Sequence, residues 1–391
     1  MNVLEPKIQT VKPILKFWKT LLIALPVLLL SFLLLSEGID FENNPIYSIS
    51  VIIAYLFINT IFILMVYSEK VDKYRSILFV TLSVCFVVAF IPSLIEFRGS
   101  IFITPEDAIK GNVSFCHLVT PFMLIPAILN RTIIFPSTML GGFAPIGTMI
   151  VIWLLASLTL GRGFCSWGCF YGGLEDGFSR LLKKPVLKKL NPKWRYFSYA
   201  VLLGAALLSL ASLSPVYCDW LCPFKAITEF VRIDSIVILI QTVIFLTLFI
   251  GLVILLPILT KKRTQCAFLC PFGAFQSFTN KVDPFEIRIN QDQCSNCKRC
   301  IEICPTFSMD ESSIQKGKAN LSCTKCGKCI DHCPQKVISL EIKSASSSKK
   351  GGIRLFFLYP AFIFLITIGS GFMIDAIFRI LLLLTTGKII Q

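Results

Sequence analysis

Two stretches of the sequence carry four cysteines each, at the same spacing. The first reads Cys294-Ser-Asn-Cys297-Lys-Arg-Cys300-Ile-Glu-Ile-Cys304-Pro305, and the second repeats it from Cys323 to Cys333-Pro334. Three thiolates separated by two residues can bind three irons of one cubane, whereas the fourth, followed by proline, reaches the other cluster. The spacing therefore predicts two [4Fe-4S] clusters with crossed ligands: the first held by Cys294, Cys297, Cys300 and Cys333, and the second by Cys323, Cys326, Cys329 and Cys304.

This duplicated signature gives residues 294–333 a resemblance to a two-cluster bacterial ferredoxin. The resemblance implies a small βαβ-type fold around two cubanes. Zinc is the alternative, because thiolate tetrads also bind that metal. Two copies in phase, each ending in proline, favour iron–sulfur clusters. His332 lies inside the second repeat and is expected at the surface rather than as a ligand.

Three further pairs of cysteines are each separated by three residues. They are Cys165/Cys169, Cys218/Cys222 and Cys266/Cys270, and each pair stands just before a phenylalanine and a short helical pattern. A proline directly after the last two pairs suits the first position of a helix, where its missing N–H costs nothing. The thiolates would then lie at helix N-termini, which favour an anionic cluster. The alternative for each pair is a structural thiol pair or a disulfide.

The composition places these cysteines in a membrane protein. Of 391 residues, 55% are hydrophobic and 16% are charged, and the mean hydropathy is +0.74, which is too apolar for a soluble surface. The net charge of +15 lies beside long apolar runs, so it indicates basic cytoplasmic loops, and we expect no nucleic-acid partner. The ordered spacing of the 16 cysteines also excludes a secreted disulfide scaffold.

Apolar stretches of about 20 residues, long enough to cross a bilayer, predict the membrane helices. They cover 17–35, 47–67, 76–96, 138–160, 196–214 and 235–259. A further stretch, 353–386, contains Pro360 and two glycines, so a hairpin of two short helices is the alternative to the single crossing that we favour. Residues 118–136 carry Asn130 and Arg131 and are expected to be interfacial or re-entrant.

The predicted fold class is therefore an all-α polytopic membrane protein with about seven transmembrane helices and an inserted α+β domain like a bacterial ferredoxin. We expect N-terminal membrane helices with an outer-face re-entrant segment over 1–137 and a membrane core with the cysteine pairs over 138–280. The ferredoxin-like domain follows at 281–343, then a flexible linker at 344–352 and a C-terminal membrane helix at 353–391.

The distribution of Lys and Arg predicts the orientation, because basic loops stay in the cytoplasm. The N-terminus and the loop 161–195 are basic, whereas the loop 36–46 between them is acidic. Both the N-terminus and the ferredoxin-like domain are thus expected on the cytoplasmic side of a prokaryotic inner membrane. The first apolar run lacks a small-residue cleavage site, so we expect it to be retained.

This topology sorts the cysteine pairs. Two pairs follow spans that end on the inner face, which predicts a third [4Fe-4S] cluster held by Cys165, Cys169, Cys266 and Cys270. Cys218 and Cys222 fall on the outer face, where Cys116 could join them in a fourth cluster completed by His117 or a non-cysteine group. An inner-side position of this pair beside one other pair, and an outer disulfide, are the alternatives.

Four other residues have chemistry that the clusters do not use. Cys85 is alone within a span and is expected to be a small buried side chain. Arg131 could meet an anion or a quinone headgroup, but a snorkelling interfacial arginine is the simpler interpretation. Glu175 and Asp176 could carry protons for quinol chemistry, although acids at a helix start need no such role.

Membrane spans, CxxxCP pairs and a double ferredoxin motif together resemble the polyferredoxin family, over residues 138–340. This family includes NapH-type and MauN-type proteins and the C-terminal half of NosR-type proteins. The resemblance implies electron transfer between the quinone pool or a cytoplasmic donor and a periplasmic redox partner. The sequence departs from the family at Phe170, where proline is expected, in its third cysteine pair and extra N-terminal spans, and in having no periplasmic flavin domain.

The expected function is therefore that of an electron-transfer component of an oxidoreductase, with at least two clusters and no catalytic residues of its own. Expected partners are the bilayer, a redox protein and, with either direction of flow, the quinone pool. One alternative is an assembly factor that reduces a metal centre of a respiratory enzyme. The other is a redox-sensing regulator, which would need an output module that the sequence does not show.

Overall fold

The structure is a computed structural model. It describes residues 13–36, 38–96, 118, 138–139, 142–143, 146–187, 190–212, 215–228, 233–343 and 350–388. Four residues singled out above, Cys116, His117, Asn130 and Arg131, lie outside this described part, as does nearly all of the expected re-entrant segment 118–136.

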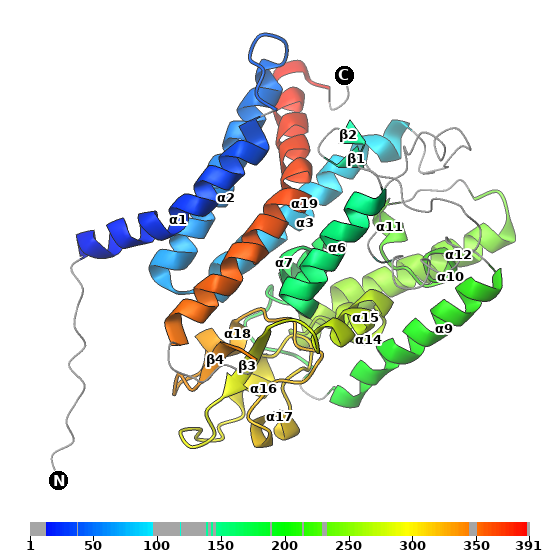
Figure 1. The fold of residues 1–391 in the computed structure, drawn as a ribbon. Coiled ribbons are helices and arrows are strands. Elements are labelled where there is room, and N and C mark those ends of the chain that lie inside the picture. Colours follow the sequence, from blue (N-terminus) through cyan, green and yellow to red (C-terminus); the bar gives the residue numbers. More distant parts are fainter. Residues whose placement is uncertain are drawn as a thin grey trace.

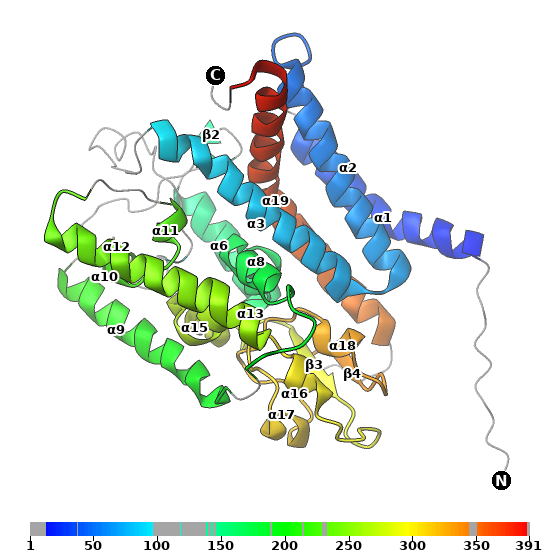
Figure 2. The same cartoon turned by 180° about the vertical axis from the view of Figure 1, so that it is seen from behind.

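Long helices lie side by side in one broad layer, and successive ones along the chain run in opposite directions (Figures 1 and 2). They are α1 (Pro13–Ser36), α2 (Pro45–Ser68), α3 (Val71–Glu96), α6 (Ile146–Leu160), α9 (Phe197–Ser212), α12 (Ile236–Leu248) and α19 (Lys350–Thr386). Helix α12 continues through a π-helix, Phe249–Leu255, into α13 (Leu256–Thr260). The last helix, α19, packs against α1, α2 and α3.

Within the described residues, five helices are long and apolar enough to cross a membrane: Lys16–Ser36, Pro45–Ser68, Pro192–Ser212, Ile236–Thr260 and Gly369–Thr386. The predicted spans 76–96 and 138–160 are not among them. The second of these is wrong in its first turns, because β1 (Thr138–Met139) and β2 (Gly142–Phe143) pair there and α6 begins only at Ile146. Gly141, Gly142 and Pro145 disfavour helix in this stretch.

The C-terminal membrane segment is one continuous helix, α19, with Pro360 inside it. The hairpin alternative is therefore wrong, and the segment is a single helix as we favoured. Helix α19 also begins earlier than expected, at Lys350, so that residues 350–352 belong to the helix and not to the linker predicted over 344–352.

The ferredoxin-like part lies at one end of the helical layer, on the side where α19 begins (Figure 1). Strand β3 (Phe285–Ile289) pairs antiparallel with β4 (Ile338–Ile342), with Phe285 opposite Ile342. Between them lie α16 (Arg299–Ile303), α17 (Glu311–Gln315) and α18 (Lys328–Asp331). Phe285 is buried, and its ring centroid is 5.2 Å from that of Phe357 in α19, which joins the two parts through one apolar core.

Candidate iron–sulfur sites

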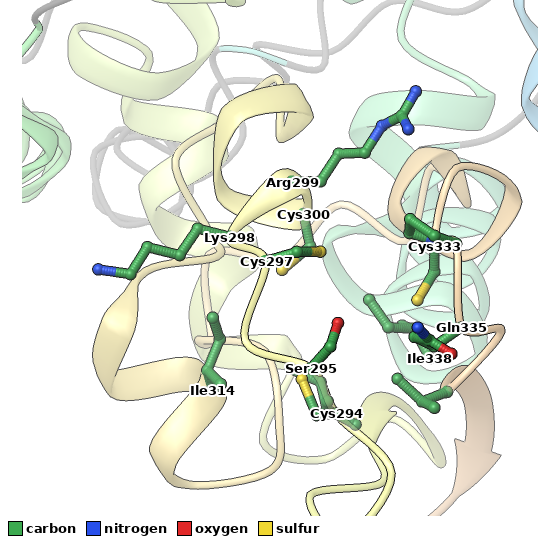
Figure 3. Close-up of a pocket in the computed structure, with 13 residues that line it drawn as sticks. Cys294, Ser295, Cys297, Lys298, Arg299, Cys300, Ile314, Cys333, Gln335 and Ile338 are labelled. Carbon is green, nitrogen blue, oxygen red and sulfur yellow. The ribbon is translucent and has the colours of Figure 1, made fainter.

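The first group of thiols surrounds a cavity near the surface of the ferredoxin-like part, and we call it site 1. Figure 3 shows the side chains of Cys294, Cys297 and Cys300 from the first repeat facing that of Cys333 from the second. Cys297 is exposed and the other three are half-buried. Burial raises the pKa of Cys300 to about 11, so iron would have to displace its proton. The grouping is the crossed set expected for the first cluster.

The second group, site 2, consists of Cys304, Cys323, Cys326 and Cys329. The four thiols lie close together, so that a negative charge on Cys304 raises the pKa of each of the other three. Burial raises the pKa of Cys323 to about 12. A negative charge on Cys300 of site 1 also raises the pKa of Cys329, so the two sites are neighbours. The N–H of Ser308 donates to Cys304 Sγ at 3.2 Å, a contact that stabilises a ligand sulfur carrying negative charge.

The third group, site 3, is built by the same local structure used twice. Cys165 lies in α7 (Phe164–Trp167) and Cys169 is the N-cap of α8 (Phe170–Phe178). In the same way Cys266 lies in α14 (Thr264–Phe268) and Cys270 is the N-cap of α15 (Pro271–Thr279). Both caps have extended backbones, with ψ of 106° at Cys169 and 111° at Cys270. All four thiols are buried, and the two pairs lie close enough for a negative charge on one to oppose ionisation of the other, as expected for a shared site.

Helix N-termini and buried arginines supply positive charge to site 3. The N–H of Gly273 donates to Cys270 Sγ at 3.3 Å. Arg263 donates to the Cys165 carbonyl at 2.5 Å and lies 3.4 Å from Cys266 Sγ. Arg162 donates to the Cys266 carbonyl at 3.1 Å. Cationic and N–H groups around thiolates are what an anionic cluster requires, so the residues of site 3 fit a [4Fe-4S] group.

Glu175 holds one of the two motifs in place. Its two carboxylate oxygens accept hydrogen bonds from the N–H groups of Gln265 at 2.6 Å and Cys266 at 3.0 Å, at the start of α14. The preceding π-helix contributes as well, because the Thr264 hydroxyl donates to the carbonyl of Leu252 at 2.6 Å. Glu175 therefore holds the start of α14 beside site 3. It lies beyond the first turn of α8, so the interpretation of Glu175 as an acid at a helix start is wrong.

A side chain larger than hydrogen at residue 172 would not fit beside these groups. A Cβ on Gly172 would come 2.2 Å from Arg263 Nη2 and 2.7 Å from the Cys165 carbonyl oxygen. Glycine at this position therefore lets α8 approach the loop that carries Cys165.

The Cys218/Cys222 pair lies next to site 3 rather than apart from it. Cys218 is in α10 (Val216–Trp220), and α11 (Lys225–Thr228), which follows Cys222, packs against α3 and α12. Phe224 stacks on Tyr171 with ring centroids 4.1 Å apart. The segment thus folds back between the long helices, which is the re-entrant path that an approach of this pair to site 3 requires.

Tyr217 connects this pair with site 3. Its buried hydroxyl accepts a hydrogen bond from Gln265 Nε2 at 3.1 Å. Cys218, Cys222 and Cys270 all lie close enough for a negative charge on their sulfurs to oppose ionisation of this hydroxyl. The expected fourth cluster would also need Cys116, which lies outside the described residues. Cys85 sits half-buried on α3, apart from these groups.

Four residues that sequence reasoning missed complete the sites: Arg75, Trp167, Arg162 and Arg263. Two of them, Arg162 and Arg263, lie in segments that the sequence analysis did consider, Gly161-Arg162-Gly163 and Lys261-Lys262-Arg263. Their charges were assigned to basic loops, although both side chains are at most 2% exposed. Among the described residues, no group of three or more Cys, His, Asp or Glu side chains is placed to hold a single metal ion.

Comparison with known proteins identifies the same segments. Residues 286–334 match a 4Fe-4S dicluster domain, and residues 142–189, 194–235 and 242–288 match three copies of a 4Fe-4S binding domain. Each of the three copies contains one CxxxC pair. These domains mean that the chain binds at least two [4Fe-4S] clusters. No solved structure matches the chain significantly.

Several curated proteins are similar over part of the chain. YccM of Escherichia coli K12, named as an electron transport protein, is 27% identical over 40% of this chain and 45% of its own length. The methylamine utilization ferredoxin-type protein MauN of Methylobacillus flagellatus is 29% identical over 50% of this chain and 66% of its own. An uncharacterized protein of Methanocaldococcus jannaschii is 29% identical over 40% and 63%. The chain thus spans 45–66% of these relatives. Its ferredoxin-type domains make it a protein that binds [4Fe-4S] clusters, and its relatives are consistent with a polyferredoxin of the MauN/NapH type.

Proposed function

We propose that this chain carries electrons between a soluble donor and the interior of the inner membrane, through three [4Fe-4S] clusters at sites 1, 2 and 3. The observation that carries the proposal is a gradient of burial along neighbouring sites. Site 1 includes the exposed Cys297, site 2 has three buried cysteines, and all four cysteines of site 3 are buried. Site 1 is thus the most exposed of the three sites and would be the entry point for a soluble partner.

The bound clusters would supply one-electron chemistry, and the residues of the chain would supply position and electrostatics. At site 1, Lys298 and Arg299 border the cavity and give a basic surface for an acidic donor. At sites 2 and 3, N–H groups and guanidinium groups stabilise the negative charge of reduced clusters. The name of the relative YccM, an electron transport protein, agrees with this role.

The acceptor would lie on the far side of site 3. The Cys218/Cys222 pair adjoins that site through Tyr217, and with Cys116 and His117 it would form a fourth site leading to a periplasmic redox protein or to quinone. The N-terminus and the ferredoxin-like part would then face the cytoplasm, in keeping with the basic residues around them. Reverse flow from quinol would use the same order of sites.

The first test is to measure iron and labile sulfide in anaerobically purified full-length protein, with EPR during stepwise reduction. Three clusters correspond to about 12 irons per chain and a fourth to about 16. About eight irons, with both ferredoxin sites filled and no further signal, would contradict the membrane site and leave a tethered ferredoxin.

A further inference from the structure

Arg75 touches the loops of two different cluster sites. It lies near the start of α3, and its side chain is 2% exposed. Its Nε donates to the carbonyl of Cys326, a ligand in site 2, at 3.2 Å. Its Nη1 donates to the carbonyl of Ser166, next to Cys165 of site 3, at 3.0 Å. One rigid guanidinium therefore spans the gap between the ferredoxin-like part and the membrane helices.

Two carboxylates pair with this guanidinium without taking all of its donors. Nη2 of Arg75 lies 3.0 Å from Asp72 and 3.3 Å from Asp176. The same two carboxylates also pair with Arg180, at 2.7 Å and 3.0 Å. The planar fork of arginine presents donors in several fixed directions. Arg75 uses this property to reach backbone carbonyls from both sites, whereas Arg180 is 28% exposed and its guanidinium donates to the two carboxylates.

A second contact runs parallel to the first. The indole Nε1 of Trp167 donates to the carbonyl of Lys325 at 3.3 Å. Residues 166–167 of α7 are thereby joined to residues 325–326 by three hydrogen bonds from buried donors, two from Arg75 and one from Trp167. The two loops hold ligands on either side of the contact, so any movement between them changes the separation of sites 2 and 3.

We infer that Arg75 is a positioning residue for electron transfer between site 2 and site 3. It fixes the distance between the sites and places a buried positive charge between them. Net charge and hydrogen bonding around a cluster set its reduction potential, and in a poorly solvated interior the effect of one charge is large. This inference rests on the proposed function, since it requires that site 3 binds a cluster.

The test compares Arg75→Gln with the matched control Arg180→Gln in the intact protein. Both changes remove a guanidinium from the same carboxylate pair, but only the first removes the contacts to Cys326 and Ser166. Arg75→Lys keeps the charge and loses the fork. The readouts are iron content, EPR-monitored midpoint potentials of sites 2 and 3, their spin–spin broadening, and the rate at which site 3 is reduced after site 2.

For Arg75→Gln we expect unchanged iron, a lower midpoint potential at site 2 or site 3, altered broadening, and transfer slowed about tenfold or more. Arg75→Lys should restore the potential but not the broadening, and Arg180→Gln should match the wild type. Equal effects of the two glutamine variants, or wild-type potentials and rate in a fully loaded Arg75→Gln protein, would overturn the inference. If Arg75→Gln loses iron, Arg75→Lys replaces it in the comparison. Broadening that differs from the wild type supports the inference, whereas wild-type broadening and rate overturn it. Absence of site 3 from the wild type is a different result, and it would overturn the proposed function itself.

Discussion

The ammonium group of Lys262 lies 2.8 Å from the carbonyl oxygen of Cys304, the cysteine that leaves the first repeat to join site 2. It also donates to the carbonyls of Ile301 and Glu302, at 3.2 Å and 2.6 Å. These carbonyls end α16, where a cation is favourable. Because Lys262 follows directly after α13, the end of a membrane helix holds a ligand loop of the ferredoxin-like part.

Replacing Lys262 by methionine should loosen that loop and make site 2 labile. We expect Lys262→Met to lose iron from site 2 several times faster than the wild type under a chelator, because three carbonyls lose a charge-assisted partner. The matched control is Lys261→Met, since Lys261 instead donates to the carbonyl of Leu182, away from the ligand loops. Iron release and the EPR signal of site 2 measure the rate of iron loss. Similar rates in the two variants would refute the role of Lys262.

Cys169→Ala should remove the cluster of site 3 and leave sites 1 and 2 filled, because the ligand sets do not overlap. Iron should fall by about four per chain, and the two ferredoxin signals should persist in EPR. Cys85→Ala provides the control, since this thiol belongs to none of the sites and its replacement should leave iron unchanged. Loss of every cluster from a folded Cys169→Ala protein would show that the ligands are partitioned wrongly.

Mild oxidation should destroy the clusters in the order of their exposure. Site 1 includes the exposed Cys297 and should lose its iron first, followed by site 2 and then site 3. The measurement is a time course of iron release and EPR signals under a fixed dose of ferricyanide. If a signal assigned to site 3, through its absence from Cys169→Ala, decayed first, site 3 would be open to solvent and the gradient of burial would not govern access.

Asp310 joins the ferredoxin-like part to the start of α9. It caps α17 by accepting from the N–H of Ser313 at 2.8 Å, and its other oxygen lies 2.8 Å from Arg195. Asp310→Ala should destabilise this junction by about 1 kcal/mol for the cap, and by more with the ion pair. Thermal unfolding of the holoprotein measures the loss. Glu311→Gln is the control, because Glu311 pairs only with the exposed Lys298 and such pairs contribute little.

The same carboxylate predicts a dependence on pH. Burial opposes ionisation of Asp310, but hydrogen bonds from Ser312, Ser313 and Arg195 outweigh it and hold its pKa well below the ordinary value of 3.8. A lowered pKa in the folded state stabilises the protein above the ordinary value, and this contribution is lost as the pH falls below it. The difference in unfolding temperature between wild type and Asp310→Ala should therefore shrink on acidification. Because the two proteins are compared at the same pH, any loss of clusters in acid affects both unfolding temperatures and cancels in their difference.

The proposed orientation can be tested from either side of the membrane. The connection between α1 and α2 lies at the end of the helical layer opposite the ferredoxin-like part (Figure 1). Glu42→Cys should react with an impermeant maleimide from the periplasmic side, and Lys336→Cys only in inverted vesicles. The unsubstituted protein is the control for labelling of its own thiols. Labelling of both positions from one side would contradict the arrangement.

Sequence reasoning succeeded where the signal was local. The spacing of the cysteines was enough to group Cys294 with Cys333 and Cys165 with Cys266, and the structure brings each pair together. It failed where the decisive contact is tertiary. Nothing near Arg75 in the sequence indicates Cys326, which is 251 residues away. Span counting separated Cys218 and Cys222 from site 3, because it assumes that every segment between helices returns to solvent, whereas the structure joins Tyr217 to Gln265 beside Cys266.

The ferredoxin-like part is inserted between α15 and α19, so both of its ends return to the membrane helices. A separate ferredoxin would have to find its acceptor by diffusion, with a rate that depends on its concentration. Here the encounter between sites 2 and 3 has already been made in folding, and the effective concentration is set by the covalent connections. The step into the membrane is therefore unimolecular. Only the arrival of the donor at Cys297 should respond to dilution, ionic strength or competition from other carriers.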